Sequence, residues 1–372
     1  MSPNPFAIVA TDPASAARAG VLQTARGPVL TPTFMPVGTR ASVKAVGPDD
    51  LRAVGAQIVL ANTYHLALRP GAELIRSLGG VQRFMGWDGP VLTDSGGYQV
   101  YSLRDTRQMS PEGIRFASVY DGSKFFLSPE KAVEAQTALG SDIMMCLDEC
   151  TPYPATEREA QISMDLTFKW AERSRASWDE RGPGLLFGIA QGSFYPKLRT
   201  ESAQALASLD FPGYAAGGLA LGEPPAARRE AIAASFLGLP ELKPRYLMGL
   251  GTPLDLLEGI KMGADLFDCV MPSRNARNGQ LFTARGKINI DNSRHRDDSG
   301  PVDPNCPCYC CRTFSRAYLR HLHRNREPLF PRLATIHNLS FYLSIVHGAR
   351  ESLLKGEFPC YYKELYEALT QR

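Results

Sequence analysis

Eight short apolar runs recur along the chain, and each ends in a polar residue or a glycine. Strands that are apolar throughout belong to a parallel sheet that is covered on both faces. Eight such strands alternating with helices are what a closed α/β barrel requires, so we expect a (β/α)8 TIM barrel. The runs are Thr33–Val37, Ile58–Asn62, Pro90–Asp94, Ile143–Asp148, Leu185–Gln191, Tyr214–Gly218, Tyr246–Gly249 and Leu266–Val270.

Residues typical of helix ends lie between these runs. Ser128 followed by Pro129 predicts an N-cap and a first helical residue, and Gly140 predicts the end of that helix. Thr156 and Glu159 form a capping box that predicts a second helix. On this second helix we expect core contact from an apolar stripe at helical spacing, formed by Ile162, Leu166 and Trp170. Within the first apolar run, Pro36 fits a strand interior badly.

The composition is that of an ordinary globular protein. With 372 residues, 44% of them hydrophobic and 21% charged, the chain can form two domains or one barrel with an insertion. No apolar run approaches the roughly 20 residues that span a bilayer, and the N-terminal sequence lacks a signal-peptide pattern. We therefore expect a cytoplasmic protein. In that reducing compartment we expect free thiols at Cys146, Cys150, Cys269 and Cys360.

Four of the eight cysteines lie within the six residues 306–311. Thiolates this close together repel one another unless a cation neutralises them, and the C-x-C-x-x-C spacing lets three sulfurs converge on one tetrahedral Zn²⁺. A set of free buried thiols is the alternative. Candidates for the fourth ligand are His321, His323 and His337 or, in a site made of four cysteines, the adjacent Cys310 and Cys311 or the distant Cys360.

Positive charge is concentrated in one part of the chain. Residues 274–326 contain eleven Lys or Arg and four Asp, a net charge of +7, whereas the whole chain carries +3. This distribution favours a polyanionic partner such as RNA. The alternative is a solvated basic face around a metal site.

In a parallel barrel the chemistry lies at the carboxyl ends of the strands. Three carboxylates, an amide and an exposed glycine backbone at those ends can bind a hydrogen-bonding heterocycle and leave carboxylates free for catalysis. A single Asp after a strand is more often a helix cap, but the recurrence around one rim favours a site. The residues at the predicted strand ends are Asn62, Asp94, Asp148, Gln191, Gly217, Gly218, Met248 and Asp268.

Two short segments extend this prediction. Gly96 and Gly97 follow Asp94 and allow a ligand to approach the backbone closely, but the segment lacks the Lys-Ser/Thr ending of a phosphate loop. Arg274 begins six residues after Asp268. Arginines so placed, Arg274 and Arg277, could hold an RNA backbone while the carboxylate reaches the sugar, or could simply pair with surface acids.

The chain resembles the bacterial tRNA-guanine transglycosylase family, also called queuine tRNA-ribosyltransferases. The resemblance covers most of the chain and rests on a set of motifs. They are TDSGGYQ (93–99), DECTPY (148–153), FGIAQGS (187–193), GGLALGE (217–223), YLMGLG (246–251), FDCVMPSRNARNGQ (267–280) and CPCYCC (306–311) with His337.

This resemblance implies a barrel with a zinc-binding insert that exchanges a wobble guanine in tRNA for a 7-deazaguanine. It assigns the nucleophile to Asp268 and the general acid/base to Asp94, and the structural zinc to Cys306, Cys308, Cys311 and His337. For the base it implies Asp94, Ser95, Gly96, Gly97, Tyr98, Asp148, Gln191, Gly218 and Met248. For the anticodon loop it implies Gly249, Leu250, Gly251, Thr252, Pro253, Leu254, Asp255, Ser273, Arg274, Asn275, Ala276 and Arg277.

Several further expectations follow from the resemblance. They are a homodimer, the small base preQ1 as substrate, and three regions: a barrel at 1–290, a zinc subdomain at 291–340 that contains a basic helix from Arg312 to Arg326, and a C-terminal helical segment at 341–372. The chain departs from the family at two positions that affect these expectations. Thr252 stands where the family usually has lysine, at an RNA contact, and Leu221 stands where it usually has valine, in the base pocket. Two rivals from other classes remain: a hydrolase of free nucleosides and a noncatalytic RNA-binding zinc module.

Overall fold

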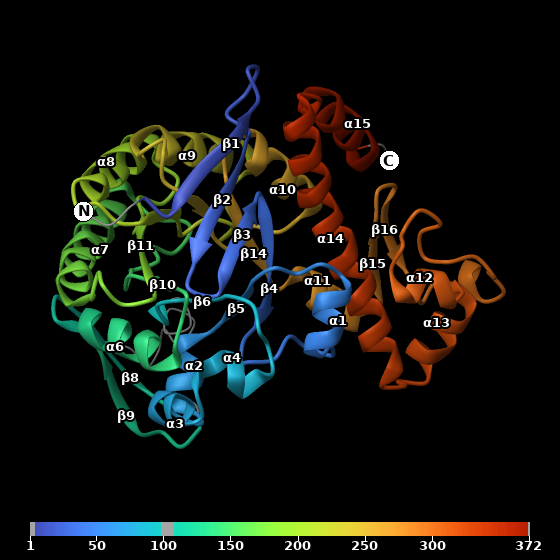
Figure 1. Ribbon diagram of the computed structural model, residues 1–372, viewed down its shortest axis with the longest axis horizontal. Helices are drawn as coiled ribbons and strands as arrows, with labels where there is room; N and C mark the ends of the chain where they lie inside the picture. The colour runs from blue at the N-terminus through green and yellow to red at the C-terminus, as the bar shows by residue number, and fades with distance from the viewer. Residues whose placement is uncertain (1–3, 98–107, 119, 371–372) are drawn as a thin grey trace.

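A computed structural model describes residues 4–97, 108–118 and 120–370. Eight parallel strands close a barrel in the order β10-β11-β12-β13-β14-β4-β5-β6, which confirms the predicted fold (Figure 1). Every predicted apolar run overlaps one of them. Their bounds are β4 (Thr33–Gly38), β5 (Val59–Ala61), β6 (Val91–Thr93), β10 (Ile143–Met145), β11 (Leu185–Ala190), β12 (Gly213–Ala216), β13 (Arg245–Leu247) and β14 (Leu266–Cys269).

The barrel closes where its last strand, β14, pairs with its first, β4. Residues Leu266 to Cys269 lie opposite Thr33 to Pro36 in parallel register, and β4 pairs with β5 through Val37 and Gly38. Pro36 thus stands where one ladder ends and before the next begins, a position that tolerates a residue without an N–H.

Helices cover the outside of the barrel. The two predicted helix starts are confirmed: Ser128 accepts a hydrogen bond from the backbone of Lys131, and Thr156 and Glu159 form their capping box. The first of these helices ends at Gly140, as predicted. The helices between strands are α1 (Pro48–Ala53), α2 (Thr63–Leu68), α3 (Ala72–Ser77), α4 (Gly80–Met85), α6 (Pro129–Leu139), α7 (Glu157–Ser177), α8 (Pro196–Ala207), α9 (Pro225–Gly238) and α10 (Pro253–Lys261).

One part of the predicted apolar stripe on α7 is wrong. Trp170 is fully buried, but Ile162 is 59% exposed. The buried face of α7 runs instead through small and polar residues such as Ala160, Ser163 and Thr167. The face predicted from hydrophobicity at helical spacing is therefore displaced by about one residue from the face that is buried.

The helix that covers the seam between β14 and β4 is α14 (Leu329–Lys355). Tyr342 packs its ring 5.2 Å from that of Phe34 on β4, and its hydroxyl donates to the carbonyl of Gly251. In Figure 1, α14 runs between the barrel and the segment of residues 280–324. It continues through residues 340 and 341, so both of the last two predicted regions contribute to one helix. α15 (Phe358–Thr370) packs against its end.

Several smaller units decorate the barrel. An antiparallel sheet of β1 (Phe6–Thr11), β2 (Arg18–Thr24) and β3 (Gly27–Thr31) precedes it, and a sheet of β7 (Gln108–Ser110), β8 (Gly113–Ala117) and β9 (Lys124–Leu127) lies between β6 and α6. After β14 come α11 (Met271–Arg277), β15 (Gln280–Thr283), β16 (Gly286–Asn289), the 3-10 helix η2 (Ser293–His295), α12 (Tyr309–Thr313) and α13 (Arg316–Arg324).

The predicted single basic helix over 312–326 is wrong, because the segment forms α12 and α13 with a break at Phe314 and Ser315. Ser315 is the N-cap of α13 and accepts a hydrogen bond from the backbone of Tyr318. We call residues 280–337, which include Cys306, Cys308, Cys311 and His337, the Cys3His module. Across the described parts of the chain, no helix has the length and apolar content needed to cross a membrane.

Candidate active site

A cavity of about 230 Å³ opens at the carboxyl ends of the barrel strands. Asp94 follows β6, Asp148 follows β10, and Asp268 belongs to β14, and all three line the cavity. The barrel therefore brings together three carboxylates that are far apart in the sequence. This is the arrangement that the strand-end residues predicted.

Asp268 is held by two hydrogen bonds to the same oxygen. The Tyr246 hydroxyl donates to Oδ1 at 2.6 Å, and the backbone N–H of Gly249 donates to it at 2.7 Å. Burial raises the pKa of Asp268, and the two donors limit that rise because they favour the anion. Burial, together with the negative charges of Asp268 and Asp94, raises the pKa of Tyr246 well above its ordinary value. Tyr246 therefore remains a protonated donor.

Asp94 is anchored by the residues at the start of α2. The amide of Asn62 donates to Oδ2, and the backbone N–H of Thr63 donates to Oδ1 at 2.9 Å. The Thr63 hydroxyl also donates to the Asp94 carbonyl at 2.5 Å. These bonds fix the position and orientation of the carboxylate at the cavity wall.

Asp148 and Gln191 form a second polar pair in the cavity. Gln191 Nε2 donates to Asp148 Oδ2 at 2.8 Å, and the Ser95 hydroxyl donates to Oδ1 at 3.1 Å. Burial raises the pKa of Asp148, while both bonds act in the opposite direction. Gln191 Oε1 is buried and has no hydrogen-bond partner among the described residues. It is an acceptor that a ligand can satisfy.

Gly218 lies beside that free acceptor. Its φ is +67°, and a Cβ at this position would collide with Gln191 Oε1. At Gly97 a Cβ would come within 2.7 Å of the Asp148 carbonyl oxygen. Both positions therefore require glycine, and Gly218 leaves backbone exposed to a ligand in the cavity.

The wall formed by residues 219–221 is held by Glu223. Its carboxylate accepts hydrogen bonds from the backbone N–H groups of Ala220 at 2.6 Å and Leu221 at 2.8 Å. Arg228 lies 3.8 Å from Glu223 and 3.1 Å from Asp255, and so links this wall to the start of α10. We did not predict Glu223 or Arg228 as site residues, although Glu223 ends the GGLALGE motif.

A fully buried arginine holds the strand ends that lead into the same wall. Arg199 donates to the carbonyl oxygens of Ser193 at 2.6 Å, Ala190 at 3.1 Å and Gly217 at 2.7 Å. It therefore ties the ends of β11 and β12 together. Burial lowers the pKa of Arg199 to about 10, which leaves it protonated at neutral pH. No motif in the sequence identified this residue.

The segments expected to contact RNA follow β13 and β14 at the same rim. Thr252 is the N-cap of α10, and its hydroxyl accepts from the backbone N–H of Asp255. In α11, Arg274 and Arg277 are exposed. Other members of the predicted set are buried and contribute shape rather than side-chain contacts; these are Leu250, Gly251, Pro253, Ser273 and Ala276.

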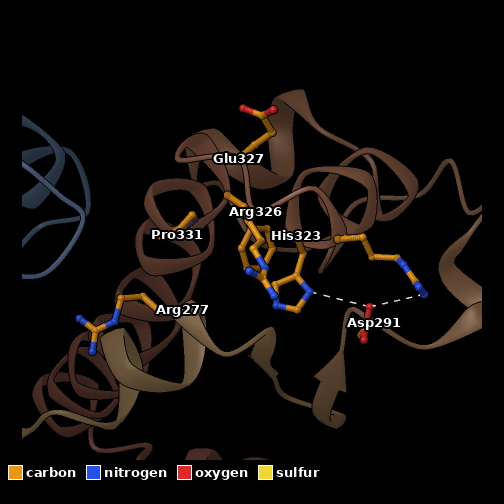
Figure 2. Close-up of a pocket in the computed structure, with 8 residues that line it drawn as sticks. Arg277, Asp291, His323, Arg326, Glu327 and Pro331 are labelled. Carbon is orange, nitrogen blue, oxygen red and sulfur yellow. Dashed lines mark ion pairs between the residues drawn. The ribbon is translucent and has the colours of Figure 1, made fainter.

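Figure 2 shows a second pocket, of about 460 Å³, on the Cys3His module. Arg277 lies at one side of it, and His323 faces Asp291. Asp291 lies 3.9 Å from His323 and from Arg324, so part of the positive charge here is balanced. None of the three cavity carboxylates lines this pocket, and we assign it no part in the chemistry.

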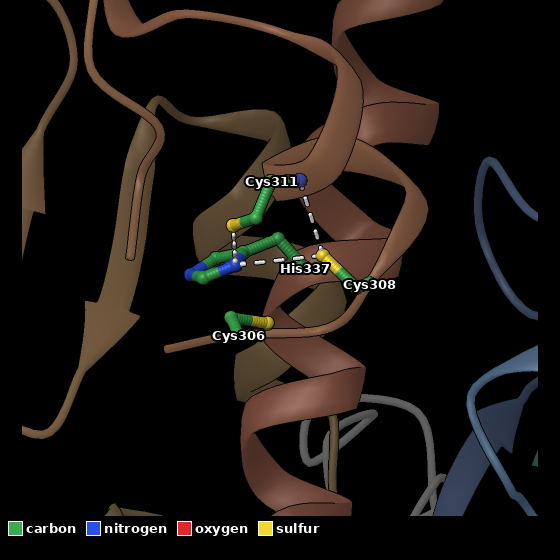
Figure 3. Close-up of side chains that lie close together, drawn as sticks. All are labelled: Cys306, Cys308, Cys311 and His337. Carbon is green, nitrogen blue, oxygen red and sulfur yellow. Dashed lines mark hydrogen bonds between the residues drawn. The ribbon is translucent and has the colours of Figure 1, made fainter. Parts of the chain in front are cut away.

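Three cysteines and one histidine converge near the start of α14 (Figure 3). The ligand atoms of Cys306, Cys308, Cys311 and His337 all lie within 4.8 Å of one another. Their Cys3His donor set fits a tetrahedral metal ion. Cys310 is buried but is not a member of this group, and neither are His321, His323 or Cys360.

The geometry of His337 prepares it as a ligand. Its Nε2 lies 2.8 Å from the carbonyl oxygen of Phe282, which can only accept, so Nε2 carries the proton. In the neutral imidazole, Nδ1 is then the nitrogen left to bind a metal, and it lies 3.2 Å from Cys311 Sγ and 3.9 Å from Cys308 Sγ. A carbonyl that orients a histidine in this way is a common partner of metal-binding imidazoles.

The structure brings most of the predicted site residues together. Asp94, Ser95, Asp148, Gly218, Met248, Gly249 and Asp268 line the cavity, and Gln191 reaches it through Asp148. Tyr98 lies outside the described residues. Tyr246 and Asn62 hold the catalytic candidates, yet we predicted no anchoring role for them, because such a role depends on which strands become neighbours.

The barrel, its acidic cavity and the appended Cys3His module define an enzyme of the (β/α)8 barrel class. Residues 12–371 match the family model described as Queuine tRNA-ribosyltransferase. The chain therefore belongs to the queuine tRNA-ribosyltransferase family, which confirms the resemblance seen in the motifs.

Curated relatives named queuine tRNA-ribosyltransferase are similar over almost the whole chain. One from Oleidesulfovibrio alaskensis is 53% identical over 365 residues, which are 98% of this chain and 96% of the relative. Another, from Francisella tularensis subsp. novicida, is 51% identical over 348 residues, or 94% of this chain and 95% of the relative.

Proposed function

We propose that the protein is a tRNA-guanine transglycosylase, a pentosyltransferase of queuosine biosynthesis. It exchanges the wobble guanine of tRNAs with a G-U-N anticodon, those for aspartate, asparagine, histidine and tyrosine, for 7-aminomethyl-7-deazaguanine (preQ1). The observation that carries the proposal is the state of Asp268. Both of its hydrogen bonds reach Oδ1, and among the described residues no donor is bonded to Oδ2. One carboxylate oxygen is therefore available for attack on a substrate in the cavity.

In the proposed reaction Asp268 attacks C1′ of the ribose and guanine leaves, which forms a covalent aspartyl-ribosyl-RNA intermediate. The incoming base then attacks C1′, and Asp268 is released. Two inversions retain the configuration at C1′, and no energy source is needed because one glycosidic bond replaces another. Asp94, held by Asn62 and Thr63, accepts a proton from the incoming base.

Base recognition is assigned to the polar pair behind the nucleophile. Asp148 and the free Oε1 of Gln191 accept hydrogen bonds from the N–H groups of the base, and the exposed backbone at Gly218 adds a further contact. Ser95, Gly96, Gly97 and Met248 complete the proposed base site, with Tyr98. Because the base must leave its stack to enter the cavity, a single-stranded loop suits the site.

We propose preQ1 rather than queuine because of Leu221. This residue lines the cavity in the wall that Glu223 holds. A leucine here reduces the space for the cyclopentenediol of queuine. If labelled queuine is incorporated as fast as preQ1, this preference is wrong.

The proposed anticodon contacts are residues 249–255 and 273–277. Arg274 and Arg277 supply exposed positive charge beside Asp268 on the sugar side. The net charge of +7 over residues 274–326 supports an RNA partner for this face.

The Cys3His site is proposed to bind one structural Zn²⁺. Its four protein ligands leave no open position for water or substrate, and the carboxylates account for the chemistry. We also propose a homodimer in the cytoplasm. The division into regions 1–290, 291–340 and 341–372 is kept as a proposal in which the last two regions share α14.

Exchange of radiolabelled guanine into unmodified tRNA with a G-U-N anticodon tests the function. We expect label in the tRNA and its release when preQ1 is added. A hydrolase of nucleosides gives net cleavage without incorporation, and a noncatalytic RNA-binding module gives neither; either result contradicts the proposal.

A further inference from the structure

Cations gather around Tyr120 in the turn between β8 and β9. The guanidinium carbon of Arg40 lies 5.5 Å from the centroid of the Tyr120 ring, and that of Arg69 lies 5.7 Å from it. His65 Nδ1 is 3.5 Å from the Tyr120 hydroxyl. Lys44 is close enough to act on His65 electrostatically. We call these five residues the Tyr120 cluster.

Two segments connect the cluster to residues that line the active-site cavity. Arg40 lies two residues beyond the end of β4, and Val37 of that strand lines the cavity. His65 belongs to α2, which begins directly after Asn62, the residue that anchors Asp94.

Packing fixes the hairpin that carries Tyr120 against α2. Tyr64 of α2 places its ring 5.3 Å from that of Phe116 on β8, and both belong to one buried apolar cluster. Figure 1 shows α2 beside β8 and β9. The position of Tyr120 over α2 is therefore set by the core beneath it.

Among the described residues, no acidic group pairs with the positive charge in the cluster. Arg40, Lys44 and Arg69 are exposed, and no carboxylate in the described part of the chain forms an ion pair with them. The adjacent acid, Asp121, accepts hydrogen bonds from Ser123 instead. Like charges held together repel one another, so an anionic ligand here lowers the free energy.

The aromatic ring gives these cations a defined geometry. Guanidinium groups over a tyrosine face are held by cation–π attraction, which reduces the entropy lost when they bind a ligand. Each planar guanidinium offers paired donors that match the oxygens of a phosphate. Burial lowers the pKa of His65, and the charges of Arg40 and Lys44 lower it further, as expected for an uncompensated positive field.

We infer that the Tyr120 cluster binds backbone phosphates of the RNA next to the nucleotide that enters the cavity; the choice of RNA rests on the proposed function. The cluster follows β4 and β5, whereas Arg274 and Arg277 follow β14. The RNA backbone is thus held on two sides of the cavity, and the neutral and acidic groups inside are left to recognise the base.

The test compares tRNA binding across a range of salt concentrations for the wild type and an Arg40→Gln/Arg69→Gln variant. Loss of two phosphate contacts to a single-stranded loop reduces the slope of log K against log salt by about 1.4. We expect roughly tenfold weaker binding at physiological salt, with the KM for the free base and the melting temperature unchanged.

Two further variants serve as controls. Arg181→Gln/Lys363→Gln removes two exposed cations from the loop before β11 and from α15, and is expected to leave the slope unchanged. Arg40→Lys/Arg69→Lys keeps the charge and is expected to keep most of the slope. An unchanged slope in the glutamine variant, or equal slopes in the glutamine variant and the distant control, overturns the inference.

The outcome is separable from the proposed function. Guanine exchange by the wild type together with an unchanged slope in the glutamine variant removes the inference and leaves the function standing. Absence of exchange by the wild type removes the function, while the slope still reports whether the cluster contacts RNA.

Discussion

Potentially anionic groups gather at two places in this molecule, and the two places handle negative charge differently. In the cavity each carboxylate has neutral donors of its own: Asn62 and Thr63 serve Asp94, and Tyr246 serves Asp268. In the Cys3His site the sulfurs and the imidazole nitrogen converge within 4.8 Å of one another. Neutral donors leave a carboxylate free to meet a ligand, whereas converging thiolates need a cation.

This difference implies that the cavity serves activity and that the Cys3His site serves stability. Changes in the cavity should remove activity and leave the fold intact, because the barrel core beneath it is apolar and independent of the carboxylates. Changes in the Cys3His site should lower stability first and activity only as a consequence. The following four experiments test that separation, beginning with the largest expected effect.

Asp268→Asn should reduce base exchange by about 10⁴-fold, because an amide cannot serve as the nucleophile. The isosteric side chain can still accept hydrogen bonds from Tyr246 and Gly249, so we expect the melting temperature to change little. Denaturing gels should show no covalent RNA adduct in this variant or in Asp268→Ala. An undiminished adduct moves the nucleophile to another carboxylate.

Cys311→Ser should abolish metal binding and destabilise the protein by about 3 kcal/mol or more, because three ligands cannot replace a closed site. Metal content by mass spectrometry and the melting temperature measure the two effects. Cys310→Ser is the matched control, since Cys310 is the adjacent buried thiol outside the cluster. Metal lost from the Cys310 variant and retained in the Cys311 variant reverses the ligand assignment.

Tyr246→Phe should lower kcat by roughly 10- to 100-fold, because it removes one donor that holds Asp268. The missing bond favoured the anion, so the pKa of Asp268 rises further above its ordinary value. Asp268 acts ionised, and the acidic limb of the pH–rate profile therefore moves to higher pH.

Tyr214→Phe provides the control for that measurement. Tyr214 is also buried, but its hydroxyl accepts from the backbone of Phe211 and contacts no carboxylate of the cavity. An acidic limb that stays in place in Tyr246→Phe, or moves equally in both variants, excludes a specific role for Tyr246.

Thr252→Ala should destabilise the protein by about 1 kcal/mol, because it removes the N-cap of α10. Thr252→Lys should lose the same cap and add a cation beside the proposed RNA contacts. We expect the lysine variant to bind tRNA a few-fold more tightly than the alanine variant, with a salt slope steeper by about 0.7. Equal tRNA affinities would show that position 252 does not face RNA.

Much of the barrel could be predicted because its strands are buried on both faces, which makes them apolar runs that end abruptly in polar residues. The same pattern placed Asp94, Asp148 and Asp268 at one rim. The metal site was equally local, since three ligands lie within six residues. The choice of His337 came from the resemblance, and the structure confirms that this histidine joins the cluster.

The rest depends on contacts between segments that are distant in sequence. Tyr246 meets Asp268 across 22 residues, and Arg199 reaches Gly217 across 18. Neither pairing has a local signal. Two other differences have local causes. Ile162 is exposed because small and polar residues form the buried face of α7. The basic segment is broken because Ser315 is the N-cap of a new helix, α13.

The seam between β4 and β14 has a consequence for the nascent chain. The two strands that close the barrel are separated by more than half of the sequence, and α14, which covers their junction, follows later still. During synthesis one edge of β4 therefore has no native partner until β14 has left the ribosome, and an unpaired edge can associate with other chains. The antiparallel sheet of β1 to β3 is made first, but its buried residues Phe6, Leu22 and Val29 pack into the same core as the barrel. The last third of the chain to be synthesised therefore determines when the edge of β4 is protected from aggregation.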